Sequence, residues 1–409
     1  MKYVIIGNSA AGVSAVEGIR SADAAGEIVV ISEERFPVYG RPLISYYLLG
    51  ATDRSRMNYR PEDFYEKMGV RLMLGERAER IDVSAKEVVL KSGARVGYDK
   101  LLVATGSRPF DPPMEGLGEV KQKFHFMSMQ DALDLEKALS VRKRALIVGA
   151  GLIGLKCLEG ILGRVKSVTV VDMAGRILPS ILDDAGAAIV QRELEAKGVR
   201  FCLSDSVKKF EQGTAHLAGG GSIPFDLLVV AVGVRPNVEL VREAGGEVAR
   251  GIVTDDHLRT SLPDVFAAGD CTESDDVSSG TRKILALLPN ATQQGFAAGV
   301  NMAGGDSALG SAIPLNAIGF FGSHVLTAGS YTGESYTEAD GDRYRRFFVQ
   351  DGVLKGFILV NAPERAGIYT SLVRNRTPLA GLDTARLEAA PVLAAFPASV
   401  REAMLSREV

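Results

Sequence analysis

The sequence predicts an α/β protein with two doubly wound parallel sheets and a smaller α+β domain at its C-terminal end. Short apolar strands alternate with helix-like stretches along most of the chain, a pattern typical of sheets covered by helices on both faces. Two glycine-rich turns, at residues 7–12 and 149–154, each follow such a strand and open a helix. After Gly304 and Gly305, hairpin signals replace the alternation. The two halves therefore predict two Rossmann-like dinucleotide-binding domains.

The predicted domain boundaries follow from the internal duplication. At 409 residues the chain is too long for one core. Each half ends in a strand followed by a glycine turn, and prolines just beyond these turns mark crossovers where a helix cannot run. We expect a discontinuous first domain of residues 1–110 and 236–304, a second domain of residues 111–235, and a C-terminal α+β domain of residues 305–409.

Composition excludes several classes of function. The chain is 46% hydrophobic and 24% charged with a net charge of −3, which is ordinary for a globular protein and leaves no electrostatic footprint for nucleic acid. Its three cysteines form no CxxC pair and no metal-ligand cluster, so we expect no metal. No signal peptide or membrane span is apparent, which favours a cytoplasmic protein with no membrane partner. A homodimer is the default assembly.

The first glycine motif, Gly7-Asn8-Ser9-Ala10-Ala11-Gly12, allows a tight turn and close approach to a pyrophosphate at a helix N-terminus. Ser9 occupies the second glycine position, where its hydroxyl can still reach a phosphate. The strand at residues 28–31 ends just before Glu33 and Glu34, where a carboxylate can accept the ribose hydroxyls of an adenosine.

The rest of this site lies far downstream. Asp270 follows a strand end at Ala268-Gly269, where it can hold the ribityl or pyrophosphate side of a flavin. Residues 289–294 fit a helix N-terminus, which stabilises negative charge on reduced flavin, although a plain helix cap is the alternative. Together these pieces predict bound FAD. The predicted FAD residues are Gly7, Ser9, Ala10, Ala11, Gly12, Glu33, Ala104, Thr105, Gly106, Gly269, Asp270, Asn290, Ala291 and Thr292.

The second glycine motif keeps all three glycines and predicts a nicotinamide dinucleotide site. The strand at residues 167–171 ends at Asp172, whose carboxylate binds an adenosine 2′-hydroxyl and repels a 2′-phosphate. NAD is therefore favoured and NADP is less expected, with Arg176 leaving the preference open. The predicted NAD residues are Gly149, Gly151, Leu152, Ile153, Gly154, Asp172 and Gly233.

With these pieces assembled, the chain resembles the pyridine-nucleotide/FAD oxidoreductase superfamily over essentially its whole length. Residues 32–45 look like the branch without a redox disulfide, which includes NADH–rubredoxin reductases, the flavin part of assimilatory nitrite reductases, ferredoxin reductases and apoptosis-inducing factor. Residues 367–373 resemble the first two of these and flavoproteins that accompany carbon monoxide dehydrogenase. The resemblance implies a glutathione-reductase-like fold and FAD contacts at Glu33, Arg41 and Pro42.

Two departures from relatives concern the redox centre. Pro42 stands where disulfide reductases and NADH oxidases of this superfamily carry a redox cysteine, so thiol–disulfide exchange has no nucleophile there. Relatives often pair a lysine and a glutamate beside the flavin, at the positions of Tyr46 and Lys156. Lys156 is therefore our candidate for the positive charge near the flavin ring, with a solvated helix lysine as the alternative. Arg41 is the other candidate catalytic residue.

These expectations combine into one reaction. NADH reduces FAD by hydride transfer, and electrons then leave singly to a rubredoxin-like or ferredoxin-like protein. The reverse direction is equally compatible with the sequence. Two alternatives stay open, an NADH oxidase that produces peroxide and a redox-sensing binding protein similar to apoptosis-inducing factor.

Overall fold

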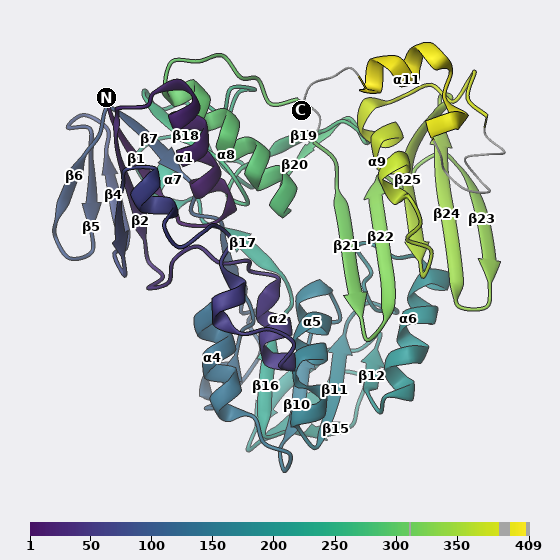
Figure 1. The fold of residues 1–409 in the computed structure, drawn as a ribbon. Coiled ribbons are helices and arrows are strands. Elements are labelled where there is room, and N and C mark those ends of the chain that lie inside the picture. The colour runs from purple at the N-terminus through teal and green to yellow at the C-terminus, as the bar shows by residue number, and fades with distance from the viewer. Residues whose placement is uncertain (311, 384–392, 406–409) are drawn as a thin grey trace. The chain divides into compact units, whose positions relative to one another are not determined.

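The structure is a computed structural model that describes residues 1–310, 312–383 and 393–405. The chain divides into two compact units (Figure 1). The first comprises Met1–Ile177, Glu195–Ser274 and Lys283–Gly310, and the second comprises Leu178–Leu194, Asp275–Arg282 and Ser311–Val409.

Five strands form the first parallel sheet of the first unit: β1 (Lys2–Ile6), β2 (Glu27–Ser32), β3 (Val70–Leu74), β7 (Lys100–Val103) and β18 (Val265–Ala267). They lie in the order β3-β2-β1-β7-β18, and every neighbouring pair is parallel. Val4, Val29 and Leu102 are completely buried, because helices and loops cover both faces. A strand covered on both faces is apolar throughout, which explains the unbroken apolar runs in the sequence.

The second parallel sheet of this unit repeats that arrangement. Its strands are β9 (Lys123–Phe124), β10 (Arg144–Val148), β11 (Ser167–Asp172), β12 (Arg200–Leu203) and β16 (Leu227–Val230). The order β12-β11-β10-β16-β9 is again parallel at every step. In both sheets the strand before the glycine motif is central, so both motifs lie at the carboxyl end of a central strand, where open α/β sheets bind their ligands.

Short antiparallel pieces complete the first unit. One three-stranded sheet contains β4 (Ala78–Asp82), β5 (Glu87–Leu90) and β6 (Arg95–Gly97), and the other contains β13 (Val207–Glu211), β14 (Thr214–Leu217) and β15 (Ser222–Pro224). The proline-marked crossovers pair with each other as β8 (Ser107–Pro109) and β17 (Val234–Pro236). Two further strands, β19 (Ser274–Asp276) and β20 (Thr281–Lys283), pair with each other.

The helices named below have these bounds: α1 (Ala10–Ala22), α2 (Leu43–Leu49), α3 (Phe64–Lys67), α4 (Met129–Ala138), α5 (Leu152–Ile161), α6 (Asp184–Ala196), α7 (Glu239–Glu243) and α8 (Leu288–Met302). The 3₁₀ turns are η1 (Arg54–Met57), η2 (Leu117–Glu119) and η3 (Leu162–Arg164). α1 and α8 run side by side (Figure 1). Their backbones approach closely, since a Cβ at Gly295 would lie 2.1 Å from the Ala11 oxygen and one at Gly299 2.2 Å from the Ala15 oxygen.

The second unit is built on an antiparallel sheet. Its strands are β21 (Leu315–Phe320), β22 (Ser323–Gly329), β23 (Glu334–Asp340), β24 (Arg343–Gln350) and β25 (Val353–Val360), in the order β21-β22-β25-β24-β23. The helical elements are α9 (Ala366–Asn375), η4 (Leu393–Ala395) and α11 (Ala398–Leu405). Asp183 belongs to this unit because it accepts hydrogen bonds from Tyr344 at 2.6 Å and Arg346 at 2.8 Å.

The predicted fold class is confirmed: two parallel α/β sheets and a smaller α+β part. The predicted hairpin around Asp351-Gly352 is the β24–β25 turn, with φ of 53° and 70° at these two residues. The helix expected from about Ala291 begins three residues earlier at Leu288, because a proline is tolerated in the first turn of a helix. The predicted domain boundaries stay predictions, and residues 311, 384–392 and 406–409 of the expected C-terminal domain lie outside the described residues.

Candidate functional site

The first glycine motif forms a closed backbone cradle at the start of α1. Gly7 has a φ of 123°, and a Cβ on it would lie 2.1 Å from the Ala104 oxygen. A Cβ on Gly12 would lie 2.0 Å from the Gly7 oxygen. Ser9 is the N-cap of α1, but its side chain makes no capping bond. The first N–H groups of this helix and the Ser9 hydroxyl therefore remain available for an anion.

The side chain of Asn8 has an unsatisfied hydrogen-bond donor that a ligand in this cradle would satisfy. Its side-chain oxygen accepts a hydrogen bond from the Tyr65 hydroxyl at 2.7 Å. Its amide nitrogen is buried and has no hydrogen-bond partner. Buried donors in native proteins are nearly always satisfied. A phosphate or another polar group of a bound dinucleotide would supply the missing acceptor.

Arg41 lies beside this loop and joins several of the predicted FAD residues. Its Nε donates to Ser9 Oγ at 3.3 Å, and one terminal nitrogen forms an ion pair with Glu34. Burial by itself would lower the pKa of Arg41, but Tyr39, Glu34 and Asp270 together raise it, so the guanidinium stays charged. From the sequence, Arg41 is expected here only through the family resemblance. The structure brings it to Ser9 and within electrostatic range of Asp270.

The Gly269-Asp270 turn is held by Gln294, a residue with no individually predicted role. The Gln294 side-chain oxygen accepts from Gly269 N at 2.6 Å and from the Thr272 hydroxyl at 3.1 Å, and its nitrogen donates to Ser274. Gln294 is buried on α8, so this helix fixes the turn. Burial raises the pKa of Asp270, and the nearby Arg41 opposes that rise. A glutamine two turns into a helix gives no sequence signal of this role.

The start of α8 holds the remaining predicted FAD residues on this side. Asn290 is buried and donates to the Leu285 oxygen at 3.3 Å. Thr292 donates to the Leu288 oxygen at 2.9 Å and lies 3.3 Å from the Tyr59 hydroxyl. Ala291 is buried as well. Pro289 has no N–H and Ala291 N donates to the Leu287 oxygen at 2.9 Å, so the donors of the first turn are the backbone N–H groups of Leu288 and Asn290.

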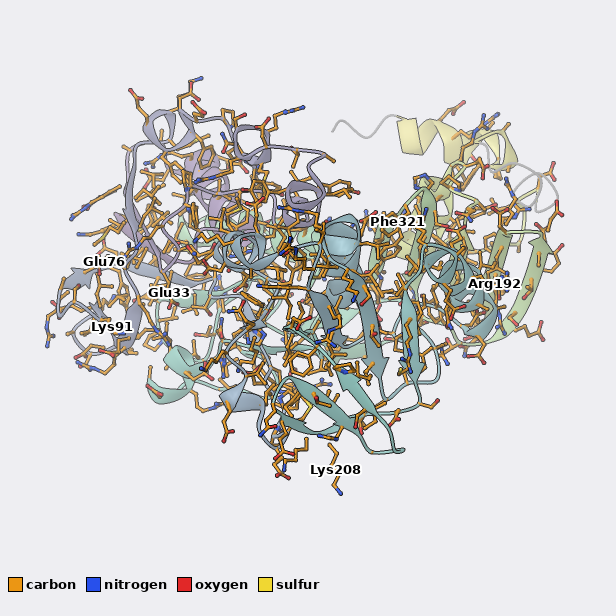
Figure 2. The ribbon with its side chains drawn as sticks, turned by 90° about the horizontal axis from the view of Figure 1, so that it is seen from below. Glu33, Glu76, Lys91, Arg192, Lys208 and Phe321 are labelled. Carbon is orange, nitrogen blue, oxygen red and sulfur yellow. The ribbon has the colours of Figure 1, made fainter. Side chains whose placement is uncertain are left out.

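The two acidic residues after β2 have different environments. The Glu33 side chain is 68% exposed and forms an ion pair with Arg77 at 3.3 Å. Figure 2 shows Glu33 on the same side of the view as Glu76 and Lys91. The Glu34 side chain is only 25% exposed and is engaged by Arg41. Of the two carboxylates, that of Glu33 is therefore the more exposed, and its contact with a ribose stays a prediction.

The second glycine motif has the same backbone geometry and a simpler surrounding. Gly149 has a φ of 113°, and a Cβ on Gly154 would lie 2.0 Å from the Gly149 oxygen. A Cβ on Gly151 would meet no atom within 4 Å, which leaves room in front of the start of α5, at Leu152 and Ile153. Asp172 ends β11 and accepts from Ala150 N at 2.6 Å. Its carboxylate therefore lies against the motif, where a ribose diol would be recognised.

Lys156 lies where α5 crosses α2. It forms an ion pair with Glu159 on the same helix, and its Nζ is 4.5 Å from the Tyr46 ring centroid. Its side chain is 17% exposed and that of Glu159 is 7% exposed. The alternative of a solvated helix lysine therefore does not describe Lys156. The partner carboxylate, Glu159, was missed because it stands three residues beyond the position at which relatives carry their glutamate.

The remaining predicted residues lie next to the two crossover strands, β8 and β17. Thr105 donates to the Asn237 oxygen at 2.7 Å, and the Asn237 amide donates back to the Thr105 oxygen at 2.8 Å. Gly106 and Gly233 have φ of 64° and 115°, and a Cβ on either would meet no atom within 4 Å. Ala104 closes the first cradle through its contact with Gly7. The predicted FAD and NAD residues therefore occur in one compact unit, on two neighbouring crossovers.

The three cysteines are free thiols in the structure. Cys271 directly follows Asp270, but it is buried and bonds to the Val103 and Ala268 oxygens. Burial raises the pKa of Cys271 to about 11 and also raises that of Cys157. Neither thiol is a thiolate at neutral pH, so neither is a ready nucleophile. Pro42 serves as the N-cap of α2.

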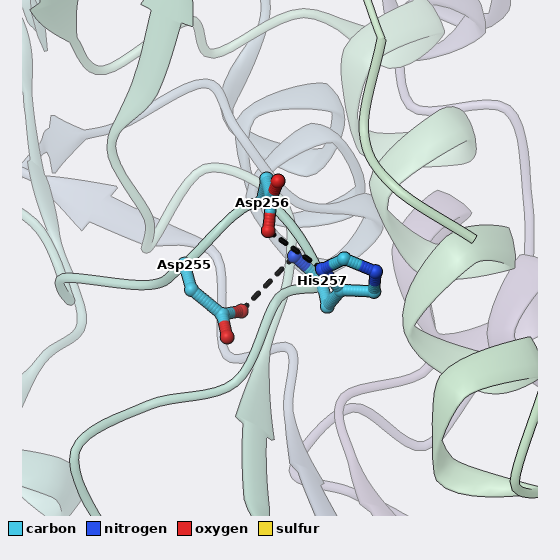
Figure 3. Close-up of side chains that lie close together, drawn as sticks. All are labelled: Asp255, Asp256 and His257. Carbon is cyan, nitrogen blue, oxygen red and sulfur yellow. Dashed lines mark hydrogen bonds and ion pairs between the residues drawn. The ribbon is translucent and has the colours of Figure 1, made fainter. Parts of the chain in front are cut away.

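Asp255, Asp256 and His257 form an acidic cluster in the first unit (Figure 3). Each offers one potential ligand atom, and these atoms lie within 4.8 Å of one another. Both His257 nitrogens are engaged, Nδ1 with Asp256 at 2.6 Å and Nε2 with Asp306 at 2.7 Å. The two carboxylates raise the pKa of His257. The cluster thus joins this loop to the segment after α8, and the expectation of no metal stays a prediction.

Comparisons with known proteins define the class. The chain matches the family described as pyridine nucleotide-disulphide oxidoreductase over residues 1–295, and it belongs to that family. It is a flavoprotein oxidoreductase that uses NAD(H). It is 32% identical to NADH-dependent phenylglyoxylate dehydrogenase subunit epsilon of Aromatoleum evansii over 93% of both chains. It is 33% identical to rubredoxin-NAD(+) reductase of Pseudomonas putida over 72% of this chain and 78% of that protein.

Solved structures show the same fold. Putidaredoxin reductase in its covalent complex with putidaredoxin matches with a TM-score of 0.87 at 23% identity, covering 100% of this chain and 99% of that one. A NAD-dependent persulfide reductase from A. fulgidus matches with a TM-score of 0.86 at 26% identity, covering 100% of this chain and 83% of that one. Among the helices described here, none has the length and apolar character needed to cross a bilayer.

Proposed function

We propose that the protein transfers electrons between NAD(H) and a small iron or iron–sulfur protein through FAD, without a redox disulfide. One observation carries the proposal: a single compact unit holds two equivalent glycine cradles, and the buried thiol that directly follows Asp270, Cys271, is protonated at neutral pH. Two dinucleotides in one unit imply electron transfer between them. The acceptor is inferred from relatives named rubredoxin-NAD(+) reductase and probable ferredoxin reductase.

FAD is assigned to the first cradle. The N–H groups at the start of α1, Ser9 and Arg41 would hold the pyrophosphate, and Asn8 would find its missing acceptor there. Glu33 would bind the ribose and Asp270 the ribityl side. When bound, FAD supplies the hydride acceptance and the one-electron release that amino-acid side chains lack. The amides at the start of α8 would stabilise negative charge on the reduced ring.

NAD(H) is assigned to the second cradle. The amides at the start of α5 would bind its pyrophosphate, and Asp172 would bind its adenosine ribose. A carboxylate at this place favours NAD over NADP, since a 2′-phosphate would meet a negative charge. Lys156, held by Glu159 and Tyr46, is the candidate positive charge at the flavin ring.

A second candidate follows from the relative that covers 93% of the chain, because its name denotes a subunit of an NADH-dependent dehydrogenase. The protein would then serve as the NAD(H)-linked subunit of a larger enzyme. Here the electron donor is another subunit rather than a diffusing carrier. The residues assigned to FAD and NAD(H) are the same in both candidates.

Stopped-flow kinetics test the proposal. The FAD-loaded protein is reduced by NADH without oxygen and then mixed with rubredoxin, ferredoxin or air-saturated buffer. We expect fast reduction followed by fast reoxidation by an iron protein. Fast peroxide formation in air without iron-protein turnover would support an oxidase. A long-lived reduced complex that no carrier reoxidises would favour the subunit role or a redox-sensing role.

A further inference from the structure

Glu34, Tyr39 and Arg41 form a compact cluster, called here the Glu34 triad. One Glu34 oxygen is paired with Arg41, and the other accepts from the Tyr39 hydroxyl at 2.7 Å. The Arg41 guanidinium carbon lies 5.5 Å from the Tyr39 ring centroid. Burial raises the pKa of Tyr39, so its hydroxyl stays protonated and donates to Glu34. The carboxylate therefore fixes the positions of two neighbours at once.

The triad reaches two segments that are distant in sequence. On one side, Arg41 donates to Ser9 Oγ in the first glycine motif. On the other side, Arg41 donates to the Met127 oxygen at 3.1 Å, and Met129 N donates to the Tyr39 hydroxyl at 2.8 Å. Met127 and Met129 flank the N-cap of α4, which follows strand β9 of the second sheet. The cluster thus links the first cradle to an element of the second half.

We propose that Glu34 and Tyr39 are positioning residues that couple FAD binding at Arg41 to the order of residues 127–131 at the start of α4. The inference rests on the proposed FAD site. Glu34 pairs with one terminal nitrogen of Arg41 and so fixes the guanidinium in the orientation in which its other nitrogens donate to Ser9 Oγ and to the Met127 oxygen. By linkage, FAD that orders this arginine also orders residues 127–131, and the reverse holds equally.

The same unit contains a matched control. The Tyr47 hydroxyl donates to Glu136 at 2.7 Å, and Arg164 donates to the other Glu136 oxygen at 3.3 Å. This Glu136 triad also contains a tyrosine, a glutamate and an arginine, and also involves α4. The Glu34 and Glu136 side chains are similarly exposed, at 25% and 32%. The hydrogen bonds named here for the Glu136 triad join Tyr47, Glu136 and Arg164 and involve no predicted FAD residue.

The experiment compares Glu34→Gln with Glu136→Gln in the full chain. FAD is titrated into the apoprotein to measure its dissociation constant, and amide hydrogen exchange at residues 127–131 is measured with and without FAD. For Glu34→Gln we expect FAD binding about tenfold weaker, roughly 1.4 kcal/mol, and no FAD-dependent protection of residues 127–131. For Glu136→Gln we expect both properties within about twofold of the wild type.

Equal effects of the two substitutions, or full FAD-dependent protection in Glu34→Gln, would overturn the proposal. Tyr39→Phe separates a loss of coupling from a general folding defect, because this variant keeps the aromatic ring and the Glu34–Arg41 ion pair. We expect it to retain FAD affinity within about threefold and to lose protection at Met129. Retained protection there would also count against the coupling. Failure of the wild-type protein to bind FAD would instead overturn the proposed function.

Discussion

The two glycine motifs share a backbone and differ in what surrounds it. In both, a Cβ on the last glycine would lie 2.0 Å from the oxygen of the first. The first motif is contacted by side chains from other segments, Tyr65 on Asn8 and Arg41 on Ser9. The second is contacted by Asp172 of the neighbouring strand. The difference fits a resident cofactor enclosed by several segments and a substrate that enters and leaves an open motif.

The largest expected effect breaks each cradle in turn. Gly12→Ala places a Cβ against a fixed backbone oxygen, and overpacking of this kind costs about 1–3 kcal/mol or more. We expect Gly12→Ala to purify without FAD. Gly154→Ala is expected to keep FAD and to reduce the rate of flavin reduction by NADH at least about 100-fold. Flavin absorbance and stopped-flow reduction measure the two effects.

Gly163→Ala is the control for these variants, because a Cβ there would meet no atom within 4 Å. It should leave both flavin content and reduction rate at the wild-type values. Loss of FAD from Gly154→Ala and from Gly12→Ala alike would contradict the assignment of different ligands to the two motifs.

The next effect compares two acidic residues, Asp172 at the end of β11 and Glu33 just after β2. Asp172→Asn keeps an acceptor for Ala150 N but removes the charge, so we expect the KM for NADH to rise about tenfold and the preference over NADPH to shrink. Glu33→Gln should weaken FAD binding and leave the KM for NADH unchanged. Steady-state kinetics with both nucleotides and FAD titrations check the pair. A crossed result, with Glu33→Gln raising only the KM for NADH, would reverse the assignment.

A third effect tests whether the positive charge of Lys156 on α5 acts on the flavin. Lys156→Met should lower the two-electron flavin potential by about 30 mV, which corresponds to about 1.4 kcal/mol. Lys137→Met is a suitable control, since Lys137 forms an i,i+3 ion pair with Asp134 on α4 but is 73% exposed. Spectroelectrochemical titration measures both variants. An unchanged potential in Lys156→Met would leave Lys156 with a structural role only.

The smallest effect concerns the acidic cluster, which is bonded to α8, the helix that packs beside α1 after the first motif. The His257 backbone oxygen accepts from Asn301 of α8, and His257 has a raised pKa because of Asp256 and Asp306. A raised folded-state pKa adds stability that is fully present below the ordinary value of about 6.5 and is lost as the pH rises through the folded value. The wild type should lose more thermal stability than His257→Gln between about pH 6 and about pH 9. Parallel pH profiles of Tm would exclude this contribution.

Periodic and turn-forming residues made the fold predictable. The apolar residues of β1, β2, β10 and β11 are buried. The apolar pattern of these segments therefore reports directly on their position in the sheets. Gly7 and Gly149 have φ of 123° and 113°, and a Cβ on Gly12 or Gly154 would lie 2.0 Å from the backbone oxygen five residues earlier. Such local requirements leave a readable signal.

Contacts between distant segments left no comparable signal. Gln294 holds the Gly269 turn from another element, Glu159 replaces the expected acidic position, and Glu34 rather than Glu33 pairs with Arg41. Each side chain is an ordinary polar residue whose role depends on what the fold places opposite it.

The sequence by itself determined the two nucleotide-binding halves, the ligand expected in each, and the proline at the position of a redox thiol. The reason is that strand periodicity and glycine geometry are short-range properties of the chain. Only the tertiary structure decided which group each charged side chain contacts. Arg41 contacts Ser9 and Glu34, Lys156 contacts Glu159 and Tyr46, and Asp172 contacts its own glycine motif. Electrostatic partners are chosen by distance in space, and burial makes those choices energetically significant.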